Sequence, residues 1–91
     1  MNRYTIKFDS RVKKDFKSIQ AQDIKRIKSA ISELGKNPRP DGCTKLKGDR
    51  HKHDYYRIRV GKYRVIYLIE DKILLVLVVR VGHRKEIYKK L

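Results

Sequence analysis

Residues 55–70, YYRIRVGKYRVIYLIE, contain two runs, 55–60 and 63–69, in which every second residue is apolar and the arginines fall on the positions between. Alternation with a period of two is typical of β-strands, because successive side chains point to opposite faces of a sheet. One face would carry Tyr56, Ile58, Val60, Tyr63, Val65, Tyr67 and Ile69. The other would carry Tyr55, Arg57, Arg59, Arg64, Ile66 and Leu68. With Gly61 and Lys62 as a tight turn between the runs, the segment predicts a hairpin with its cations on one face.

A third strand is predicted after the hairpin. Glu70 and Asp71 mark a turn, and residues 73–79 form an unbroken apolar run that is rich in β-branched side chains. A run of this kind favours a central strand that is covered on both faces. In residues 84–91, the spacing between Ile87 and Leu91 indicates a short terminal helix.

The residues before the hairpin predict one strand and two helices. Residues 4–8 alternate in the same way and indicate a short strand. Ser10 is a candidate N-cap for a first helix, and Gly35 with the prolines after it would end a second. Helical spacing marks the buried stripes of these helices, formed by Val12, Phe16, Ile19, Ile24, Ile27, Ile31 and Leu34.

Together these elements predict an α+β fold in a single domain, residues 1–91. The expected order is an N-terminal strand, a two-helix hairpin, a three-strand antiparallel meander that completes a four-stranded sheet, and a short C-terminal helix. A chain of this length buries roughly 60% of its extended surface, so we expect one modest core.

The chain carries 25 Lys and Arg against 10 Asp and Glu, a formal net charge of +15. This excess predicts a polyanionic partner, because nucleic acid, an anionic membrane and an acidic protein all gain from pairing with clustered cations. No stretch reaches the roughly 18 apolar residues of a membrane span, and the N-terminus lacks the apolar core of a signal peptide. We therefore expect a soluble, cytoplasmic protein.

Neither a metal nor a cofactor is predicted. Cys43 is the only cysteine, so it has no partner for an internal disulfide and belongs to no zinc motif. His51 and His53 have no third ligand at a fixed spacing, and the cations around them disfavour a metal ion. The sequence also lacks a glycine-rich phosphate loop, a nucleophile elbow and a carboxylate pair.

Arg57 and Arg59 would lie on the same side of a strand, and the turn at Gly61 would bring Arg64 beside them. Like charges at cross-strand distance repel, so this arrangement would destabilise the fold unless an anion binds there. The pattern therefore favours a phosphate-binding site. Separate, solvated arginines on an outer face of the sheet are the alternative interpretation.

His83, Arg84 and Tyr88 follow the apolar strand, where side chains can reach an adjoining cleft. A histidine at such a place is often structural, and a tyrosine in a short helix is as often a packing anchor as a phosphate or base contact. The reaction that best fits all these residues needs mainly phosphate positioning and charge neutralisation. RNA cleavage by attack of the substrate's own 2′-hydroxyl on the neighbouring phosphorus is such a reaction.

Three stretches resemble the RelE toxin family: residues 46–48 (LKG), 56–67 (YRIRVGKYRVIY) and 81–88 (VGHRKEIY). The expected order of elements agrees along nearly the whole chain, although the N-terminal strand and helices match only in pattern. The resemblance implies a RelE-like fold, a RelB-like antitoxin as partner, and cleavage of messenger RNA in the ribosomal A site. It also allows a toxin-antitoxin complex that binds operator DNA.

The resemblance implies a set of catalytic residues as well, namely Arg57, Arg59, Arg64, Arg84 and Tyr88. The founding toxin has lysines in place of Arg57 and Arg59. Because arginine stays protonated and is a poor general base, we expect this pair to clamp phosphate. We expect His83, which titrates near neutrality, to handle a proton. The further basic residues expected to contact RNA are Lys45, Lys47, Arg50, Lys52, Lys62 and Lys85.

Two other functions remain open at this point. A ParE-like relative would share the fold but act on DNA gyrase through protein contacts, without catalytic residues. A noncatalytic RNA-binding module would need only the net charge and some aromatic side chains. The basic strand, combined with the His83 to Tyr88 ending, favours the nuclease.

Overall fold

The computed structural model describes residues 3–46 and 54–90. The first half contains strand β1 (Thr5–Phe8), helices α1 (Ser10–Lys17) and α2 (Ala21–Leu34), and the short strand β2 (Thr44–Leu46). The second half contains β3 (Tyr55–Val60), β4 (Tyr63–Glu70), the 3₁₀-helix η1 (Asp71–Ile73), β5 (Leu75–His83) and the 3₁₀-helix η2 (Ile87–Lys90). The predicted α+β class is confirmed.

The strands form one five-stranded sheet in the order β1-β5-β4-β3-β2. Strand β1 runs parallel to β5, and all other neighbours are antiparallel. Val60 pairs with Tyr63, so Gly61 and Lys62 form the predicted turn between β3 and β4. Gly61 has a φ of 57°, a left-handed conformation that suits glycine in such a turn. The predicted meander is therefore confirmed.

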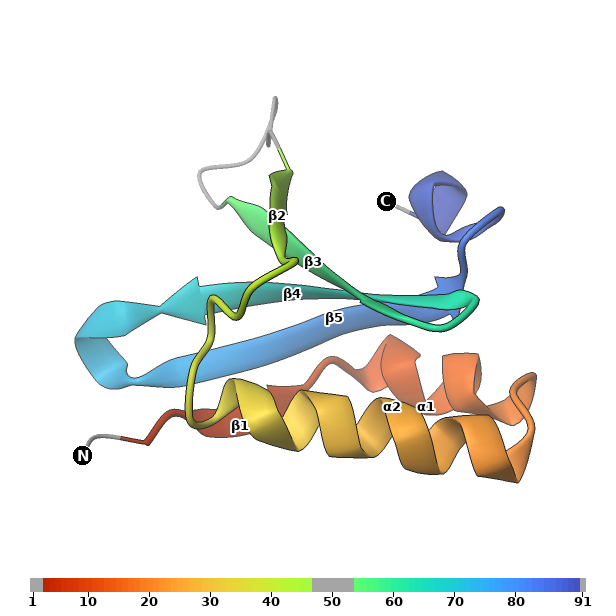
Figure 1. Ribbon diagram of the computed structural model, residues 1–91, viewed down its shortest axis with the longest axis horizontal. Helices are drawn as coiled ribbons and strands as arrows, with labels where there is room; N and C mark the ends of the chain where they lie inside the picture. The colour runs from red at the N-terminus through yellow and green to blue at the C-terminus, as the bar shows by residue number, and fades with distance from the viewer. Residues whose placement is uncertain (1–2, 47–53, 91) are drawn as a thin grey trace.

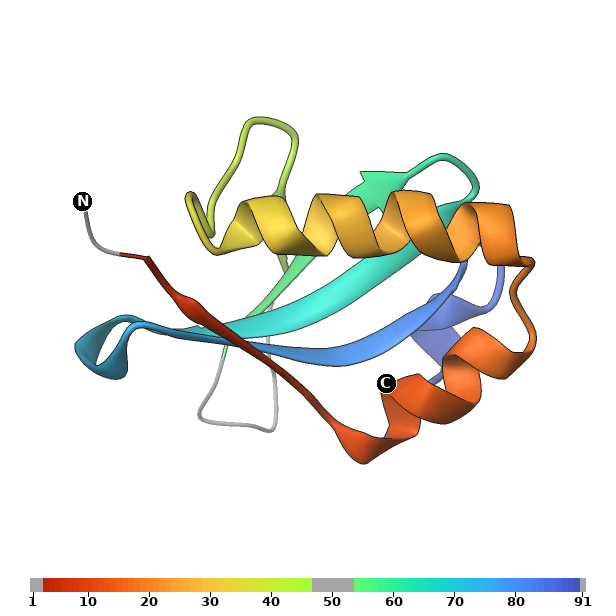
Figure 2. The same cartoon turned by 90° about the horizontal axis from the view of Figure 1, so that it is seen from below.

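Both helices cover one face of the sheet, as the two ribbon views show (Figure 1, Figure 2). The main core lies between these layers, where Val12, Ile27 and Ile31 pack against the inward side of the strands. All residues predicted for the apolar face of the 55–70 hairpin contact this core. None of the helices in the described part of the chain is long and apolar enough to cross a membrane.

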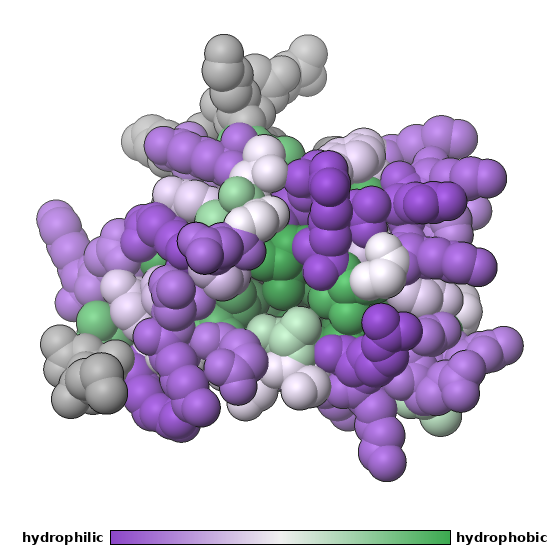
Figure 3. Space-filling view, in the orientation of Figure 1, coloured by the Kyte–Doolittle hydropathy of each residue, from purple (hydrophilic) through white to green (hydrophobic). Residues whose placement is uncertain are grey.

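The opposite face, here called the open face, carries a smaller apolar cluster. Ile66 of β4 and Val79 of β5 pack there against Ile87 of η2. In Figure 1, η2 accordingly lies on the other side of the sheet from the helices. Hydrophilic side chains dominate the molecular surface around an apolar central strip (Figure 3). The open face thus carries a small apolar anchor that holds η2 on the sheet.

An irregularity in β5 decides which way its last residues point. Tyr67 pairs with Val78 whereas Ile66 pairs with Arg80, so Val79 is an extra residue in the strand. Such a β-bulge shifts the alternation of the following side chains by one position. Val78 and Val81 consequently both contact the main core, although they are an odd number of residues apart.

The sheet has one strand more than predicted. Residues Thr44–Leu46 pair with β3 and form its outer edge. The four-stranded prediction missed this element because a strand of 3 residues is too short to display a period. The predicted apolar strand begins at Leu75, because the residues before it form η1.

Two helix ends also differ from the prediction. The cap of α1 is Asp9 and not Ser10, since the Asp9 carboxylate accepts a hydrogen bond of 2.9 Å from the Arg11 N–H. The terminal helix is a single 3₁₀ turn of residues Ile87–Lys90. Leu91, which was expected to pack in that helix, lies outside the described residues.

Candidate functional site

Three arginines lie together on the open face of the sheet. Arg59 and Arg64 are direct partners across β3 and β4, and Arg57 is two residues from Arg59 on the same strand. Because they alternate with residues of the main core, their side chains point away from the helices. We call Arg57, Arg59 and Arg64 the arginine cluster.

The charges of the arginine cluster act on one another. Burial lowers the pKa of the Arg64 guanidinium, and the charges of Arg59 and Arg57 lower it further, with a smaller effect from Arg84. Arg64 Nη1 donates to the carbonyl oxygens of Gly61 and Tyr63, at 3.0 and 2.8 Å. Across residues 3–46 and 54–90, no carboxylate forms an ion pair with the cluster. An anion bound there would relieve this repulsion.

The Nε–H of Arg57 is available to donate a hydrogen bond to such an anion. This Nε is buried and has no hydrogen-bond partner within the described residues. Leaving a buried donor unpaired costs about 1–3 kcal/mol, and more when the group is charged. Its Nη2 donates to the Thr44 hydroxyl at 2.8 Å, so β2 helps to hold the guanidinium in place.

Tyr88 reaches the arginine cluster from the end of the chain. Its hydroxyl oxygen accepts a hydrogen bond of 2.7 Å from Arg57 Nη1. The side chain is 47% exposed, so the phenol is fixed at its oxygen while it stays accessible to a ligand. The structure therefore brings together Arg57, Arg59, Arg64 and Tyr88, and the charge of Arg84 acts on the same place.

A buried carboxylate organises the end of β5. Asp15 of α1 is 4% exposed and accepts hydrogen bonds from the Arg80 guanidinium at 3.1 and 2.9 Å. It also accepts the backbone N–H of Val81 at 3.0 Å. Strand β1 pairs with β5 only as far as Val78, so the backbone N–H of Val81 has no partner strand on that side of β5. The Asp15 carboxylate accepts this hydrogen bond in place of a strand. The sequence interpretation missed Asp15, although its spacing from Val12 places it on the buried stripe of α1.

The same carboxylate holds the segment that carries Tyr88. Lys90 Nζ lies 3.2 Å from Asp15 Oδ1, and Ile87 is fully buried. A Cβ at Gly82 would lie 3.1 Å from Ile87 Cδ1, so the glycine leaves room for η2 to pack closely on the sheet. These contacts fix both ends of the short turn in which Tyr88 lies.

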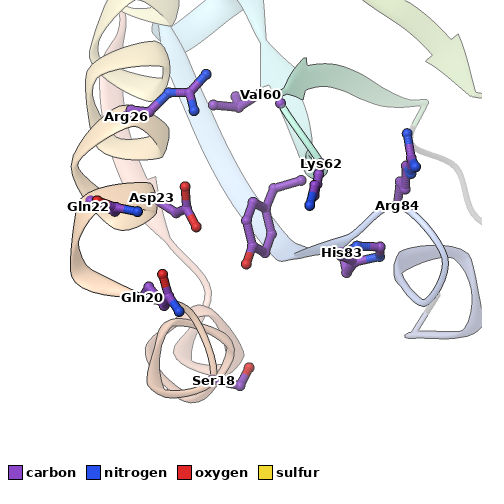
Figure 4. A pocket seen from close by; sticks show the side chains of 11 residues that line it. Ser18, Gln20, Gln22, Asp23, Arg26, Val60, Lys62, His83 and Arg84 are labelled. Carbon is purple, nitrogen blue, oxygen red and sulfur yellow. The ribbon is translucent and has the colours of Figure 1, made fainter.

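His83 does not lie beside the arginine cluster, which corrects the expectation of an imidazole at that place. It pairs with Tyr63 across β4 and β5, and the two rings meet edge to face with centroids 6.0 Å apart. Tyr63 contacts the main core, so both rings point to the helix side of the sheet. The bulge at Val79 is the cause, because strict alternation from Val76 would place His83 on the open face. His83 is among the residues that line a cavity whose other wall is α2 (Figure 4).

Three of the basic residues expected to contact RNA are described, and they lie on different elements. Lys45 pairs in register with Tyr56, on the helix side, and forms an ion pair of 3.0 Å with Asp54. Lys62 is exposed in the β3–β4 turn, where its carbonyl oxygen accepts the Arg84 N–H at 2.8 Å. Lys85 is exposed just after β5. Lys47, Arg50 and Lys52 lie outside the described residues, as do His51 and His53.

No group of three or more His, Cys, Asp and Glu side chains within the described ranges could hold a metal ion. Cys43 is a free, half-buried thiol.

The sequence matches a known family and curated relatives. The family described as the ParE toxin of type II toxin-antitoxin system, parDE, matches residues 6–88. Toxin RelE3 of Methanocaldococcus jannaschii is 42% identical over 77 residues, which cover 82% of this chain and 84% of the relative. The putative toxin RelE1 of the same organism is 29% identical over 89 residues, covering 96% and 97%.

The fold also matches solved structures. An archaeal RelE-RelB complex from Pyrococcus horikoshii OT3 contains a chain with a TM-score of 0.77 and 28% sequence identity. The match covers 90% of this chain and 96% of that one. Sequence and fold thus point to one family of proteins.

Proposed function

Because the chain belongs to the ParE toxin family, within the RelE/ParE superfamily of type II toxin-antitoxin systems, we propose that it is an endoribonuclease that cleaves messenger RNA in the ribosomal A site. The observation that carries this proposal is the arginine cluster with Tyr88 bound to it. Among the described residues, these guanidiniums have no carboxylate partner and lie next to an accessible phenol. This arrangement matches the needs of a phosphodiester substrate.

The reaction proceeds by attack of the 2′-oxygen of the RNA on the neighbouring phosphorus. The bond from phosphorus to the 5′-oxygen breaks, and a cyclic phosphate remains on the upstream fragment. Negative charge builds up on the phosphoryl oxygens in the transition state, where Arg57, Arg59 and Arg64 stabilise it. Their fixed positions also align the phosphate with the attacking oxygen.

Tyr88 handles a proton in this reaction. Arginine is protonated at every physiological pH, so the cluster itself cannot accept the proton of the 2′-hydroxyl. The Tyr88 oxygen accepts from Arg57, which leaves its own O–H free to donate its proton to the leaving 5′-oxygen. The proton of the 2′-hydroxyl passes to solvent water, and the Tyr88 oxygen regains a proton from water after the fragments separate. His83, the residue first expected in this role, points to the other side of the sheet.

The partner that neutralises this toxin is a RelB-like antitoxin in the cytoplasm. Its relative from Pyrococcus horikoshii forms a RelE-RelB complex, and a net charge of +15 favours an acidic segment that covers the open face. The complex of the two proteins binds operator DNA through the antitoxin. Expression of the chain alone is expected to be toxic, and coexpression of the antitoxin relieves the toxicity.

The test is a translation extract programmed with a defined message. Wild-type protein should cut the message at ribosome-bound positions and leave a 2′,3′-cyclic phosphate. A message with one 2′-deoxynucleotide at the mapped position should resist cleavage there and be cut normally elsewhere. Cleavage that ignores the 2′-deoxy substitution would rule out attack by the 2′-oxygen.

A ParE-like action on DNA gyrase is the second candidate, because the matching family is described as the ParE toxin. Such a protein would act through protein contacts and would not need the arginine cluster. Loss of gyrase supercoiling in the presence of this chain, together with an intact message in the extract, would favour it over the nuclease. RNA binding without any cleavage would instead favour a noncatalytic RNA-binding module.

A further inference from the structure

Thr44 lies directly beside Arg57 at the edge of the sheet. The two residues are partners in the antiparallel register of β2 and β3, and direct partners across two strands point to the same face. Arg57 points to the open face, so Thr44 points there as well. The Thr44 hydroxyl oxygen accepts a hydrogen bond of 2.8 Å from Arg57 Nη2. This contact joins the outermost strand of the sheet (Figure 1) to the arginine cluster.

The guanidinium of Arg57 is held from two opposite sides of β3. Thr44 accepts from Nη2, and the Tyr88 hydroxyl accepts from Nη1 at 2.7 Å. Strand β2 lies beyond β3 at the edge of the sheet, whereas η2, which carries Tyr88, packs on residues of β4 and β5. One hydrogen bond would leave the guanidinium free to turn about it. Two bonds at its two ends fix the orientation of the plane.

Both acceptors leave the charge of Arg57 intact. They are neutral hydroxyl oxygens, so they orient the guanidinium without neutralising it, as a carboxylate would. The Nε–H has no hydrogen-bond partner within the described residues. It stays available for a phosphate together with the second N–H of each Nη.

Other forces act against this orientation of Arg57. Arg59 is two residues further along β3 and faces Arg64 on β4, so three like charges share one place. A long arginine side chain also regains rotamer freedom when it turns into solvent. The bond to Thr44 therefore opposes both repulsion and disorder at the position where a phosphate would bind.

The backbone that carries Thr44 is itself fixed. Leu46, two residues further along β2, packs against the apolar cluster of the open face. The loop before β2 is held by the buried Tyr67, whose hydroxyl donates to the carbonyl oxygen of Pro38 at 2.7 Å. The Thr44 hydroxyl is thus presented to Arg57 from an anchored strand.

We propose that Thr44 is a positioning residue for RNA cleavage, which turns the free N–H groups of Arg57 toward the scissile phosphate. This inference rests on the proposed nuclease function and adds a residue that acts on the reaction only through Arg57. Alignment of a charge donor matters because a displacement of about 1 Å can slow an enzyme about a hundredfold. It also gives the short strand β2 a role in the site.

A role of Thr44 in stability alone is disfavoured by its exposure. The side chain lies on the surface, where substitutions usually change the free energy of unfolding little. Valine has nearly the shape of threonine and a similar preference for β-strands. Thr44→Val therefore removes the hydroxyl and should leave the strand in place.

The first test compares the rates of message cleavage in a translation extract. Thr44→Val should lower the rate at saturating substrate about tenfold, the scale of one hydrogen bond to a charged group. Thr44→Ser keeps the hydroxyl and should restore most of this rate. Thr5→Val is the matched control, because Thr5 is exposed on β1, the opposite edge strand of the sheet. It should cleave like wild type.

The second test asks whether Thr44 acts through Arg57. Arg57→Ala should slow cleavage more than Thr44→Val does, because it removes the phosphate donor itself. Adding Thr44→Val to Arg57→Ala should cause no further loss, since the group to be positioned is already absent. If Thr44→Val slows cleavage by the same factor with and without Arg57, Thr44 acts independently of Arg57 and the inference is overturned.

The third test is independent of cleavage and measures the order of the Arg57 guanidinium by nitrogen relaxation of its Nε–H group. The resonance is assigned by its loss in Arg57→Lys. It should be well ordered in wild type and Thr44→Ser and mobile in Thr44→Val. Equal order in wild type and Thr44→Val would overturn the inference. If wild type does not cleave RNA, the nuclease proposal fails, while this measurement still decides whether Thr44 fixes the guanidinium.

Discussion

Lys90 in the last turn of the chain lies 3.2 Å from the buried carboxylate of Asp15 in the first α-helix. These two residues are 75 positions apart, and their contact holds η2 against α1 beside the end of β5. Between Ile87, which is fully buried, and Lys90 lies Tyr88, whose hydroxyl reaches Arg57. The position of the phenol on the open face therefore depends on an ion pair at the edge of the sheet.

Lys90→Met should reduce RNA cleavage because it releases η2 and with it Tyr88. The side chain of Lys90 is 29% exposed, so the free energy of unfolding should change by only about 1 kcal/mol or less. Cleavage rate at saturating substrate and the urea midpoint are measured in parallel. Lys89→Met is the matched control, since Lys89 is an exposed neighbour, and Lys90→Arg should restore part of the activity. Equal cleavage by Lys90→Met and Lys89→Met would show that the ion pair does not position Tyr88.

Stability should fall in acid, and Asp15 should account for part of the fall. Burial raises the pKa of the Asp15 carboxyl, but the hydrogen bonds from Arg80, Val81 and Lys90 outweigh burial and bring the pKa below its ordinary value. The folded state then binds fewer protons, so the stabilisation is complete above the ordinary pKa of about 3.9 and is lost as the pH falls through the folded value.

The measurement is the urea midpoint of wild type and Asp15→Asn between about pH 2 and pH 6. Asp15→Asn should be less stable at the upper end and should show a shallower decline. The decline should not vanish, because the pKa values of Asp9 and Asp71 are also lowered, by hydrogen bonds from Arg11 and Arg39. Parallel curves for the two proteins would contradict the assignment to Asp15.

Much of the fold could be predicted from the sequence because every second residue in both strands of the 55–70 hairpin is apolar. Every inward residue of that stretch contacts the core. The side of the sheet to which His83 points could not be predicted in this way. The apolar run gives no sign of the bulge at Val79, and the bulge moves the later side chains of β5 to the opposite face. Asp15 was missed because a carboxylate on a helix is ordinarily solvated, and its partners Arg80 and Lys90 become neighbours only after folding.

The arginine cluster should lower the free energy of unfolding while it supports RNA cleavage. Arg59 faces Arg64 across the strands, so Arg59→Gln removes a repulsion and should leave the free energy of unfolding unchanged or raise it by about 0.5 kcal/mol. The same variant should cleave RNA more slowly, because one phosphate donor is lost. Urea denaturation at low and high salt checks the first part, and salt should stabilise wild type more than the variant. A loss of stability in Arg59→Gln would mean that Arg59 has a structural partner.

His83→Gln should leave the pH dependence of cleavage unchanged between about pH 5 and pH 8, the range in which histidine titrates. The imidazole points to the helix side, where its Nδ1 accepts the Lys85 N–H at 3.2 Å, and not to the phosphate site. The overall rate is free to change, because His83 lines the cavity. A changed pH dependence of cleavage in the variant would show that His83 takes part in the proton transfer.

The most direct measurement is the rate of message cleavage in a translation extract by Arg64→Ala, compared with Arg3→Ala. Arg3 is exposed ahead of β1, at the opposite edge of the sheet from β3, so the control removes the same charge without touching the arginine cluster. Loss of one transition-state donor should slow Arg64→Ala about a hundredfold, while Arg3→Ala cleaves like wild type. Equal rates for a folded Arg64→Ala and for Arg3→Ala would contradict phosphate binding by the cluster.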